Sequence, residues 1–495
     1  MASGNDSRPV PRIPAGLRDT FAQDVVALRQ MVNIIQTTYE RYGFEPLETP
    51  ALEYVDVLGK YLPDSDRPQG DIFSLRDEDG QWIALRYDLT APLSRVIAKY
   101  GPELPTPFRR YQFGPVWRRE KPGIGRFRQF YQCDFDTVGT SSLVADAEVC
   151  AVLSDCFESL GIRRGSYLIR VNNRKILNGV LDTIAIPSDE SEGGESQRLV
   201  VLRAIDKLDR LGTEGVRELL TVGRRDPSGD FTPGAELTTK QADAVLDFVA
   251  AGGKDRVAVC SRLRELVAES AIGHEGANEL EQIHSLLESM KLGSDQVVFD
   301  PSVVRGLAYY TGPVFEAVLT FETSEDEGER RPFGSVAGGG RYDGLVRRFT
   351  GTSVPATGCS IGVDRLLAAL KAIGRANVEQ FQGPVVVAVL DPKRLIEYQS
   401  MVTELRNAGI PAEIYLGDAN FRSQLKYASR RRSPVAVIAG EDEFSRGEVS
   451  LKDLRLGKEL SKEIKDREVW LREQPAQTSV RREQFVEAVS RLLER

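Results

Sequence analysis

The spacing of apolar residues changes within the first third of the chain. Between Phe21 and Ile35 apolar side chains recur close to every 3.6 residues, which predicts a long amphipathic helix. Gly43 is placed to cap the C-terminal end of this helix. From Asp71 to about Gly139 apolar residues fall instead in short runs separated by turns, which predicts an antiparallel meander. The runs cover residues 72–75, 82–85, 110–113 and 127–135.

A long helical block follows this meander. Helical spacing dominates over about 175–295, and the acidic stretch 188–196 within it predicts a solvated loop. Strand-like sequence returns at 314–321, followed by a glycine-rich turn at 338–340 and a helix over 363–373. The block therefore looks like an insertion that interrupts a single antiparallel-sheet domain.

The last part of the chain alternates between strands and helices. A strand at 385–390 begins a β-α-β-α-β series, which is typical of a small, largely parallel α/β domain. The predicted fold class is therefore α+β, with a helical insertion in the sheet domain and a C-terminal α/β domain. The predicted boundaries are 1–15 for a flexible tail, 16–174 with 296–375 for the sheet domain, 175–295 for the insertion and 383–495 for the last domain.

Composition narrows the class of protein. With 41% apolar and 28% charged residues the chain can bury a core, which excludes a wholly disordered protein. Its longest aliphatic run, 385–390, is far shorter than the roughly 20 residues that span a bilayer. Five cysteines without a C-x-x-C pair argue against a disulfide framework and structural zinc, so we expect a cytoplasmic protein. The net charge of −8 means that a nucleic-acid partner must be held by local basic patches.

The highest density of candidate functional side chains lies between Phe108 and Asp136. Basic residues outnumber acidic ones there, and 122–125 predicts the loop of a hairpin. Side chains two apart share one face of a strand, so Gln132, Asp134 and Asp136 point together. Guanidinium groups beside carboxylates suit a zwitterionic, phosphorylated substrate, although a solvated charged hairpin explains the same residues. The basic residues are Arg109, Arg110, Arg118, Arg119, Lys121, Arg126 and Arg128.

Three further segments carry candidate chemistry, and each also has a purely structural explanation. Arg305 and the tyrosine pair 309–310 lead into a strand, as in an ordinary β-turn with core aromatics. The glycine run 338–340 can bring backbone close to a ligand or form a tight turn. Asp364 and Arg365 lie in the first turn of a predicted helix, where the pair can complement the helix dipole.

In this order and spacing, the segments resemble class II aminoacyl-tRNA synthetases, and more closely the histidyl-tRNA synthetase family. The predicted first helix and the strand ending at Pro50 match the dimer-forming first motif of that class. FGPVWRRE with GRFRQF matches the second motif, and GCSIGVDRLL matches the third. RGLAYYTGPVFEA and AGGGRYDGLV are similar to the signature peptides of the histidine-specific family. The resemblance implies a homodimeric ligase that forms histidyl-adenylate from histidine and ATP and then charges tRNA(His).

The resemblance also implies which residues bind ATP. Arg118 would lie at the α-phosphate, and Arg365 at the γ-phosphate and adenine. Arg126 would reach the β- and γ-phosphates, and Glu120 would meet the adenine. Arg305 would be the family's own catalytic arginine beside the α-phosphate. Mg²⁺ is expected with ATP as a substrate complex, without a metal site of the protein itself.

A pocket for histidine is implied in the same way. Asp88 and Thr90 would hold the α-ammonium group, and Gln132 would lie at the carboxylate. Asp136 and Tyr310 would bind the imidazole. The complete implied set is Asp88, Thr90, Gln132, Asp136, Tyr309, Tyr310 and Tyr342.

The chemistry of amino-acid activation is compatible with these residues. A carboxylate attacks the α-phosphorus of ATP in line, so two anions approach and negative charge grows on the phosphoryl oxygens. Positioning and fixed positive charge supply most of the catalysis, and no protein general base is needed. Two features depart from the family: Ala308 stands where the signature peptide usually carries aspartate, and the hairpin tip 121–125 replaces a more polar sequence. The first concerns the catalytic arginine. This departure leaves the exact placement of Arg305 open.

The C-terminal domain carries a basic helix face. Arg422, Lys426 and Arg430 are four residues apart on one side of a predicted helix, which alone is typical of a solvated face. Because the domain resembles the anticodon-binding domain of this synthetase group, we predict that the face binds tRNA. Lys121, at the hairpin tip, is predicted to contact tRNA as well. The predicted C-terminal contacts are Arg422, Lys426, Arg430, Arg431 and Arg432.

Three alternative functions compete with this interpretation. A non-catalytic regulatory paralogue that senses histidine typically lacks the C-terminal domain and some phosphate-binding arginines, whereas this chain keeps Arg118, Arg305 and Arg365. A class II synthetase for another amino acid is disfavoured by the tyrosine pair and by AGGGRYDG. An RNA-binding module would account for the C-terminal helix but not for the motif arginines.

Overall fold

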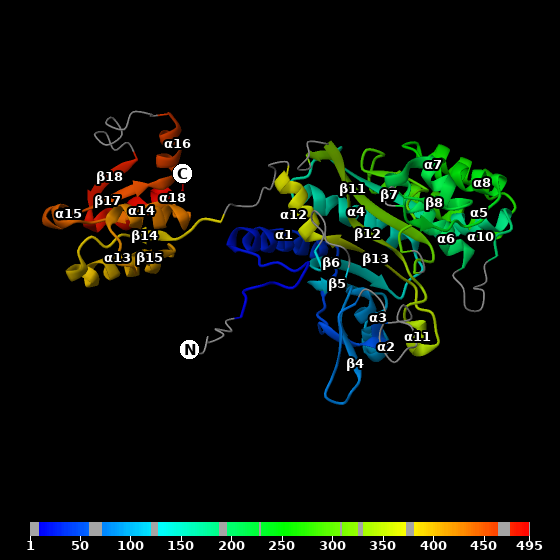
Figure 1. Ribbon diagram of the computed structural model, residues 1–495, viewed down its shortest axis with the longest axis horizontal. Helices are drawn as coiled ribbons and strands as arrows, with labels where there is room; N and C mark the ends of the chain where they lie inside the picture. Colours follow the sequence, from blue (N-terminus) through cyan, green and yellow to red (C-terminus); the bar gives the residue numbers. More distant parts are fainter. Residues whose placement is uncertain are drawn as a thin grey trace, which may run out of the picture. The chain divides into compact units, whose positions relative to one another are not determined.

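The computed structural model consists of two compact units, residues 1–378 and 379–495, each with its own hydrophobic core (Figure 1). The structure describes residues 9–58, 72–119, 127–187, 196–226, 229–306, 309–324, 330–372, 381–463 and 476–494. Among these residues, no helix combines the length and the apolar character that a bilayer crossing requires.

The first unit is built on a large sheet of eight strands, counted over the described residues, in the order β1-β5-β6-β13-β12-β11-β7-β10. β1 runs parallel to β5 and β10 parallel to β7, whereas the other neighbours are antiparallel. The predicted antiparallel-sheet fold is confirmed. The strands are β1 Glu45–Pro46, β5 Phe108–Trp117, β6 Gln129–Val138, β7 Tyr167–Asn173, β10 Val297–Phe299, β11 Pro313–Ser324, β12 Arg330–Arg341 and β13 Ala356–Gly362.

The prediction of one continuous meander is wrong. The runs at 72–75 and 82–85 do not extend the large sheet, because β2, β4 and β3 pair in a separate three-stranded sheet. The helix α3 then separates this small sheet from β5. The bounds are β2 Leu52–Tyr54, α2 Val55–Leu58, β3 Ser74–Arg76, β4 Trp82–Leu85 and α3 Thr90–Tyr100.

The predicted glycine-rich turn at 338–340 is also wrong, because these residues belong to strand β12. A Cβ on Gly339 would lie 2.1 Å from the carbonyl oxygen of Gly358 on the neighbouring β13. The glycines therefore allow a close approach between two strands rather than a change of chain direction.

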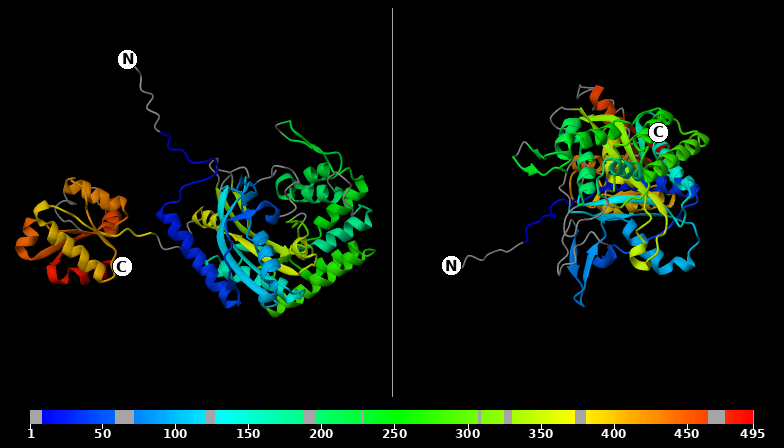
Figure 2. Two further views of the ribbon diagram at one scale, coloured as in Figure 1. Left: turned by 90° about the horizontal axis from the view of Figure 1, so that it is seen from below. Right: turned by 90° about the vertical axis from the view of Figure 1, so that its right-hand side faces the viewer.

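Four helices pack together along one side of the large sheet (Figure 2). The predicted first helix is confirmed as α1, and its buried residues include Met31, Ile35 and Tyr39. The Tyr39 hydroxyl donates to the carbonyl of Cys133 on β6 at 3.1 Å. The apolar face of α1 is thus covered by the chain's own sheet. The helices are α1 Ala22–Arg41, α4 Leu143–Ser159, α10 Ala271–Ser289 and α12 Val363–Ala372.

The helical block shares this core. Helix α10 packs against both α4 and α5, and one hydrophobic cluster joins Phe157 of α4 to Leu280 of α10 and Val245 of α8. A short hairpin of β8 and β9 lies within the block. The remaining elements are α5 Arg174–Thr183, α6 Gln197–Ile205, α7 Leu208–Leu220, β8 Arg224–Arg225, β9 Phe231–Thr232, α8 Thr239–Val249 and α9 Arg256–Leu266.

The second unit contains a sheet in the order β15-β14-β16-β17-β18. Its first three strands are parallel, as the β-α-β-α-β pattern predicts, but β17 and β18 are antiparallel. These two strands are not predicted from the sequence, because neither contains a run of apolar residues. The main elements are β14 Val385–Val387, α13 Leu395–Asn407, β15 Ala412–Ile414, α14 Phe421–Arg430, β16 Val435–Ile438, β17 Glu448–Asp453, β18 Gln477–Arg481 and α18 Phe485–Leu493.

A buried ion pair fastens β12 to α4. The Arg341 guanidinium contacts the Asp146 carboxylate, and the two side chains are 5% and 0% exposed. The same guanidinium donates to the carbonyls of Thr140 at 3.1 Å and Ser142 at 3.3 Å. Burial raises the pKa of Asp146, and the charge of Arg341 opposes this rise. The arginine of the second signature peptide is therefore structural.

Replacing Asp146 with alanine should lower the free energy of unfolding of the first unit by about 3–5 kcal/mol, because the Arg341 charge stays buried without its partner. Urea unfolding measures this change. Glu281→Ala is the control, since it removes an exposed pair with Arg264 in the same unit and should cost less than about 1 kcal/mol. Equal losses in the two variants would contradict the role given to the buried pair.

Candidate active site

A cavity of about 1100 Å³ opens on the large sheet. Along β6, Phe135 points into the core, where its ring centroid lies 4.9 Å from that of Tyr39 on α1. Because strand side chains alternate, Gln132 and Asp134 point to the opposite face and line the cavity. Ser360 of β13 lies beside them. The floor of the cavity is therefore the side of the sheet that faces away from α1.

The walls come from segments that are far apart in the sequence. They are the residues at the start of α3, residues 305–306 and 309–311, residues 344–345 and 347–348, and helix α6 of the helical block. Helix α6 contributes Leu199 and Arg203. The helical block is thus part of the site and not only an appendage to it.

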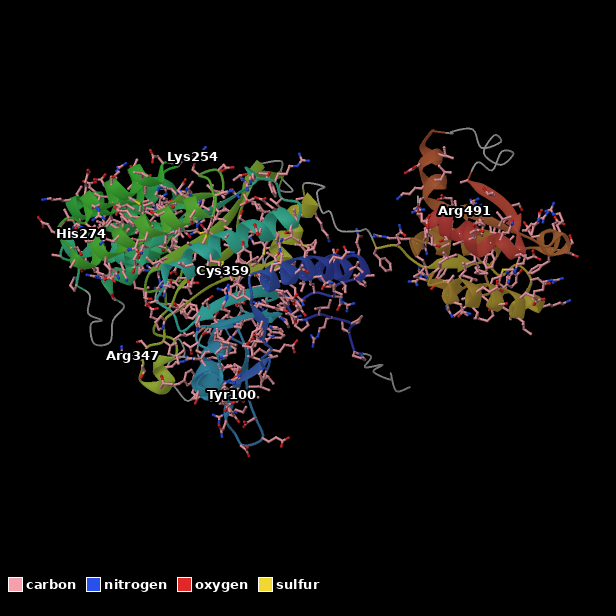
Figure 3. All side chains as sticks on the ribbon, turned by 180° about the vertical axis from the view of Figure 1, so that it is seen from behind. Tyr100, Lys254, His274, Arg347, Cys359 and Arg491 are labelled. Carbon is pink, nitrogen blue, oxygen red and sulfur yellow. The ribbon has the colours of Figure 1, made fainter. Side chains whose placement is uncertain are left out.

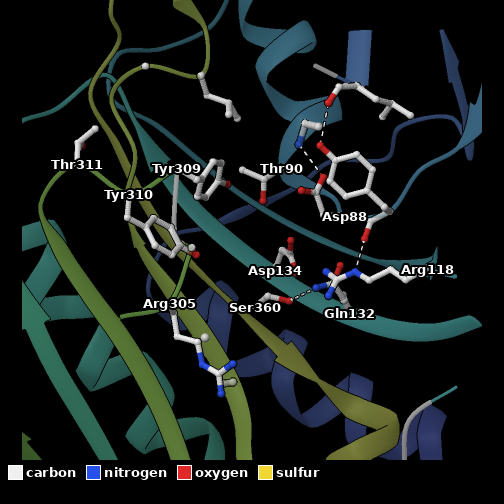
Figure 4. A pocket seen from close by; sticks show the side chains of 18 of the residues that line it. Asp88, Thr90, Arg118, Gln132, Asp134, Arg305, Tyr309, Tyr310, Thr311 and Ser360 are labelled. Atoms are coloured by element: carbon white, nitrogen blue, oxygen red, sulfur yellow. Dashed lines mark hydrogen bonds between the residues drawn. The ribbon is translucent and has the colours of Figure 1, made fainter. Parts of the chain in front are cut away.

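Most of the predicted histidine-binding residues line this cavity (Figure 4). The Asp88 carboxylate accepts the backbone N–H of Ala91 at 2.9 Å. Burial raises the pKa of Asp88, whereas the Ala91 amide and Arg118 lower it. The rings of Tyr309 and Tyr310 pack edge to face with centroids 4.7 Å apart. The predicted residues that line the cavity are Asp88, Thr90, Gln132, Tyr309 and Tyr310.

Asp134 is a cavity residue that was not in the predicted set. Its side chain is 2% exposed, and burial raises its pKa to about 7, with Arg110 lowering it and Asp136 raising it further. Its neighbour Gln132 donates from Nε2 to the Ser360 hydroxyl oxygen at 2.8 Å. A buried carboxyl group that faces a cavity is a candidate for binding a cationic group of a ligand.

Asp136 and Tyr342 are buried and are not among the described residues that line the cavity. The Tyr342 hydroxyl donates to Oδ1 of Asp136, and Arg110 pairs with Oδ2 at 2.7 Å. Burial raises the pKa of Asp136, and Arg110 is the largest influence that lowers it. A Cβ on Gly358 would lie 2.1 Å from Oδ1, so glycine is needed there to admit this carboxylate.

The predicted catalytic arginines line the same cavity, with Arg118 close to Asp88. Arg118 lines it, donates from Nε to the Tyr87 carbonyl at 2.9 Å and lies over the ring of Phe130. Arg305 donates from Nε to Glu316 at 2.8 Å and remains 45% exposed. The two guanidiniums are therefore oriented by the chain's own groups while both remain cavity residues.

A buried arginine holds the loop that carries Arg305. Arg174, at the start of α5, donates from Nη2 to the carbonyls of Val304 at 3.3 Å, Arg305 at 2.8 Å and Gly306 at 3.3 Å. Burial lowers the pKa of Arg174 to about 10. Gly306 has a φ of +60°, and a Cβ there would lie 2.3 Å from the ring of Tyr310. Arg174 thus fixes the backbone of both Arg305 and the tyrosine pair.

Arg365 does not line the cavity in the part of the chain that the structure describes. Its Nη2 donates to the Phe333 carbonyl at 3.0 Å. The neighbouring Asp364 accepts the backbone N–H of Tyr131 at 2.6 Å and pairs with Arg18 at 2.7 Å. Asp364 therefore ties the N-terminal segment and β6 to α12, which is more than a local helix-dipole effect.

The structure does not describe every residue named in the sequence analysis. Glu120, Lys121, Arg126 and Ala308 lie outside the described residues. Both histidines of the chain belong to α10, where Figure 3 labels His274, and neither lines the cavity. A histidine base at this site is thus not part of the arrangement.

The predicted tRNA-binding residues of the C-terminal unit lie on and after α14. Arg422, Lys426 and Arg430 are exposed on one face of this helix. Arg431 pairs with Glu413 at 2.8 Å, so part of its charge is already neutralised. Arg432 follows the helix with a φ of +56°.

Three site residues escaped the sequence analysis for different reasons. Asp134 shares a strand face with Gln132, so alternation alone could have included it. Arg174 and Arg203 lie in the helical block, and no local pattern connects that block with the motif arginines. Only the tertiary fold brings Asp134 and Arg203 to the cavity and Arg174 to the backbone of Arg305.

The class of protein follows from the fold and the cavity together. The mainly antiparallel sheet, the motif arginines on it and the separate C-terminal unit are those of a class II aminoacyl-tRNA synthetase with an anticodon-binding domain.

Comparisons with known proteins define the family. The model for histidyl-tRNA synthetase matches residues 16–366, and the model for the anticodon binding domain matches 384–492. A curated histidine–tRNA ligase of Cereibacter sphaeroides is 58% identical over 98% of both chains, and one of Paracoccus denitrificans is 55% identical over 100% of both. The crystal structure of histidyl-tRNA synthetase from Nostoc sp. PCC 7120 aligns with a TM-score of 0.71 and 28% identity, over 98% of this chain and 100% of that one. The chain belongs to the histidyl-tRNA synthetase family.

Arg174→Met should lower the turnover number of amino-acid activation by about tenfold to a hundredfold, because the loop with Arg305 loses three carbonyl contacts. Arg256→Met is the matched control, since Arg256 is also buried and donates to the carbonyls of Val297 and Leu292, away from the cavity. Thermal unfolding of both variants separates stability from turnover. The same fall in turnover for both would assign Arg174 a merely structural role.

Proposed function

We propose that this protein activates histidine with ATP to form histidyl-adenylate and pyrophosphate, and then transfers histidine to the 3′ end of tRNA(His). Membership of the histidyl-tRNA synthetase family supports this reaction. The observation that carries it in the structure is a single cavity that holds acceptors for an ammonium group together with Arg118 and Arg305. A zwitterionic amino acid and a polyphosphate can therefore meet there.

The role proposed for the cavity arginines follows from their positive charge. Arg118 and Arg305 can neutralise the charge that develops on the α-phosphate as the carboxylate of histidine attacks and pyrophosphate leaves. Because both side chains are already held by Tyr87 and Glu316, little reorganisation is needed during the reaction. Mg²⁺ enters with ATP as part of the substrate. Arg365, Arg126 and Glu120 are proposed as further ATP contacts on the basis of the family resemblance.

Histidine is proposed to lie between Asp88 and the tyrosine pair. Asp88 and Thr90 suit the ammonium end, and Tyr310 suits the imidazole. Asp136 and Tyr342 would support the pocket without lining it, because their mutual hydrogen bond fixes its shape. A pocket built from polar groups rejects analogues that leave those groups without partners.

The second unit is proposed to bind the anticodon arm of tRNA(His). Its match to the anticodon binding domain supports a tRNA contact, and the exposed cations of α14 provide a surface for phosphates. Lys121 is proposed as a contact of the acceptor end. We also propose a cytoplasmic homodimer. The five buried, unpaired cysteines suit a reducing compartment, and the family resemblance supports the dimer.

Histidine-dependent ATP–pyrophosphate exchange tests the proposed reaction. Exchange should be stimulated by histidine and by no other standard amino acid. Tight binding of histidine without exchange would instead favour a non-catalytic regulator, and stimulation by a different amino acid would favour another synthetase. Sedimentation at micromolar concentration tests the proposed homodimer. A sedimenting species with the mass of one chain would contradict it.

Arg305→Ala should lower the rate of histidyl-adenylate formation by roughly a hundredfold or more, because a preorganised charge beside the α-phosphate is lost. Single-turnover measurements at saturating ATP and histidine detect this change. Arg264→Ala, at an exposed pair outside the cavity, serves as the control. A rate within about threefold of the parent at saturation would contradict the assignment of Arg305.

The triple variant Arg422→Ala, Lys426→Ala, Arg430→Ala should bind tRNA(His) more weakly, with a shallower dependence of affinity on salt. Loss of three phosphate contacts should reduce the log–log slope by about 2–3. Amino-acid activation should be unchanged, which makes pyrophosphate exchange an internal control. An unaltered salt slope would show that this face of α14 does not contact tRNA.

A further inference from the structure

Two buried oxygen atoms at the cavity are not used by the protein. They are Oδ1 of Asp134 and Oε1 of Gln132, and neither has a hydrogen-bond partner among the described residues. The two side chains are 2% and 8% exposed, and both line the cavity. A buried acceptor without a donor is costly, so these atoms indicate a donor that arrives with the ligand.

The charges around Asp134 favour a cationic donor. Arg110 pairs with Asp136 at 2.7 Å, and Arg86 donates to the carbonyls of Thr49 at 2.7 Å and Pro115 at 3.1 Å. Arg86 is thus engaged by backbone carbonyls, and Arg110 forms an ion pair with Asp136, although its Nε and Nη1 have no hydrogen-bond partner among the described residues. Asp134 itself receives a hydrogen bond from the Ser360 side chain.

Among the described residues the carboxylate of Asp134 forms no ion pair of its own, although the charge of Arg110 acts on it. Burial, together with the charges of Asp136 and Asp88, raises its pKa to about 7, although Arg110 and Ser360 act in the opposite direction. A ligand cation beside Asp134 would favour its ionised form. The atom available for such a contact is Oδ1 of Asp134, which is identified by its position at the cavity and its lack of a hydrogen-bond partner among the described residues.

The orientation of Gln132 specifies which part of the amino acid lies here. Its Nε2 donates to the Ser360 hydroxyl oxygen, so the atom left for a ligand is the acceptor Oε1. An acceptor suits an ammonium group and not a carboxylate. Asp88, which interacts electrostatically with Asp134, offers a second carboxylate in the same cavity. Figure 4 shows the three side chains grouped on the side of the site opposite Tyr310.

We propose that Asp134 is a further substrate-binding residue that contacts the α-ammonium group of the amino-acid substrate. The ammonium group has three N–H donors, which match one carboxylate oxygen of Asp88, Oε1 of Gln132 and Oδ1 of Asp134. This inference rests on the proposed function, because it assigns one group of histidine to one side chain of the same cavity. Gln132 is accordingly assigned to the ammonium group of the substrate, and not to its carboxylate as the family resemblance implies.

Three ligands separate the ammonium group from the imidazole. Histidine and histidinol carry both groups, whereas 3-(imidazol-4-yl)propanoate lacks the ammonium. Asp134→Asn should weaken binding of histidine and histidinol by about tenfold or more, as expected for a lost hydrogen bond to a charged group. It should change the affinity for the propanoate by less than about twofold. Isothermal titration calorimetry measures the three dissociation constants.

Two further variants keep the test decisive. Asp155→Asn is the matched control, since Asp155 is a partly exposed carboxylate that contacts Tyr42 away from the cavity, and it should leave all three affinities unchanged. Asp134→Ser keeps a polar side chain without charge, and replaces the asparagine variant if that one unfolds.

Equal losses for all three ligands, or no loss for any, would overturn the assignment of Asp134. If the parent protein itself fails to bind histidine, the proposed function fails, whatever Asp134 does. The outcomes for the residue and for the reaction are therefore distinguishable.

Discussion

The alternation of side chains along β6 is the constraint on which the rest of the site depends. Cys133 and Phe135 are buried toward α1. There the ring of Tyr39 packs on the ring of Phe135, and the Tyr39 hydroxyl donates to the carbonyl of Cys133. With these residues fixed in the core, Gln132, Asp134 and Asp136 must point to the other face of the sheet. A slip of one residue in the pairing with β5 or β13 would exchange the two sets. The hydrophobic core therefore determines which polar groups the cavity receives.

The second requirement is that the charges of the cavity stay in place before any substrate arrives. Arg118 and Arg305 are oriented by the Tyr87 carbonyl and by Glu316, and Arg174 holds the backbone beneath Arg305. Arg110 likewise offsets Asp136. Because these partners belong to strands, helices and their ends, the charges do not need to move during the reaction. The helical block contributes to this arrangement through α5 and α6, which explains why it shares a core with the sheet.

The sequence predicts the fold well where local spacing decides the structure. The amphipathic helix α1, the hairpin β5–β6 and the parallel strands of the second unit follow from apolar periodicity. The separate small sheet and the strands β17 and β18 do not, because pairing partners are set by tertiary structure. In the site, the resemblance identifies most of the cavity residues. It cannot tell that Asp134 lines the cavity whereas Asp136 is enclosed by other side chains, because both share one strand face. Their depth depends on Arg110 and Tyr342, the latter from a distant segment.

The central claim is that one cavity holds the amino acid at its carboxylates and the reacting phosphorus at its arginines. A crystal structure of the protein with histidinol and ATP tests this claim most directly. The account predicts an ammonium group beside Asp88 and the guanidiniums of Arg118 and Arg305 within hydrogen-bond distance of the α-phosphate oxygens. Nucleotide bound with both guanidiniums far from the α-phosphate, or histidinol bound outside this cavity, would contradict it.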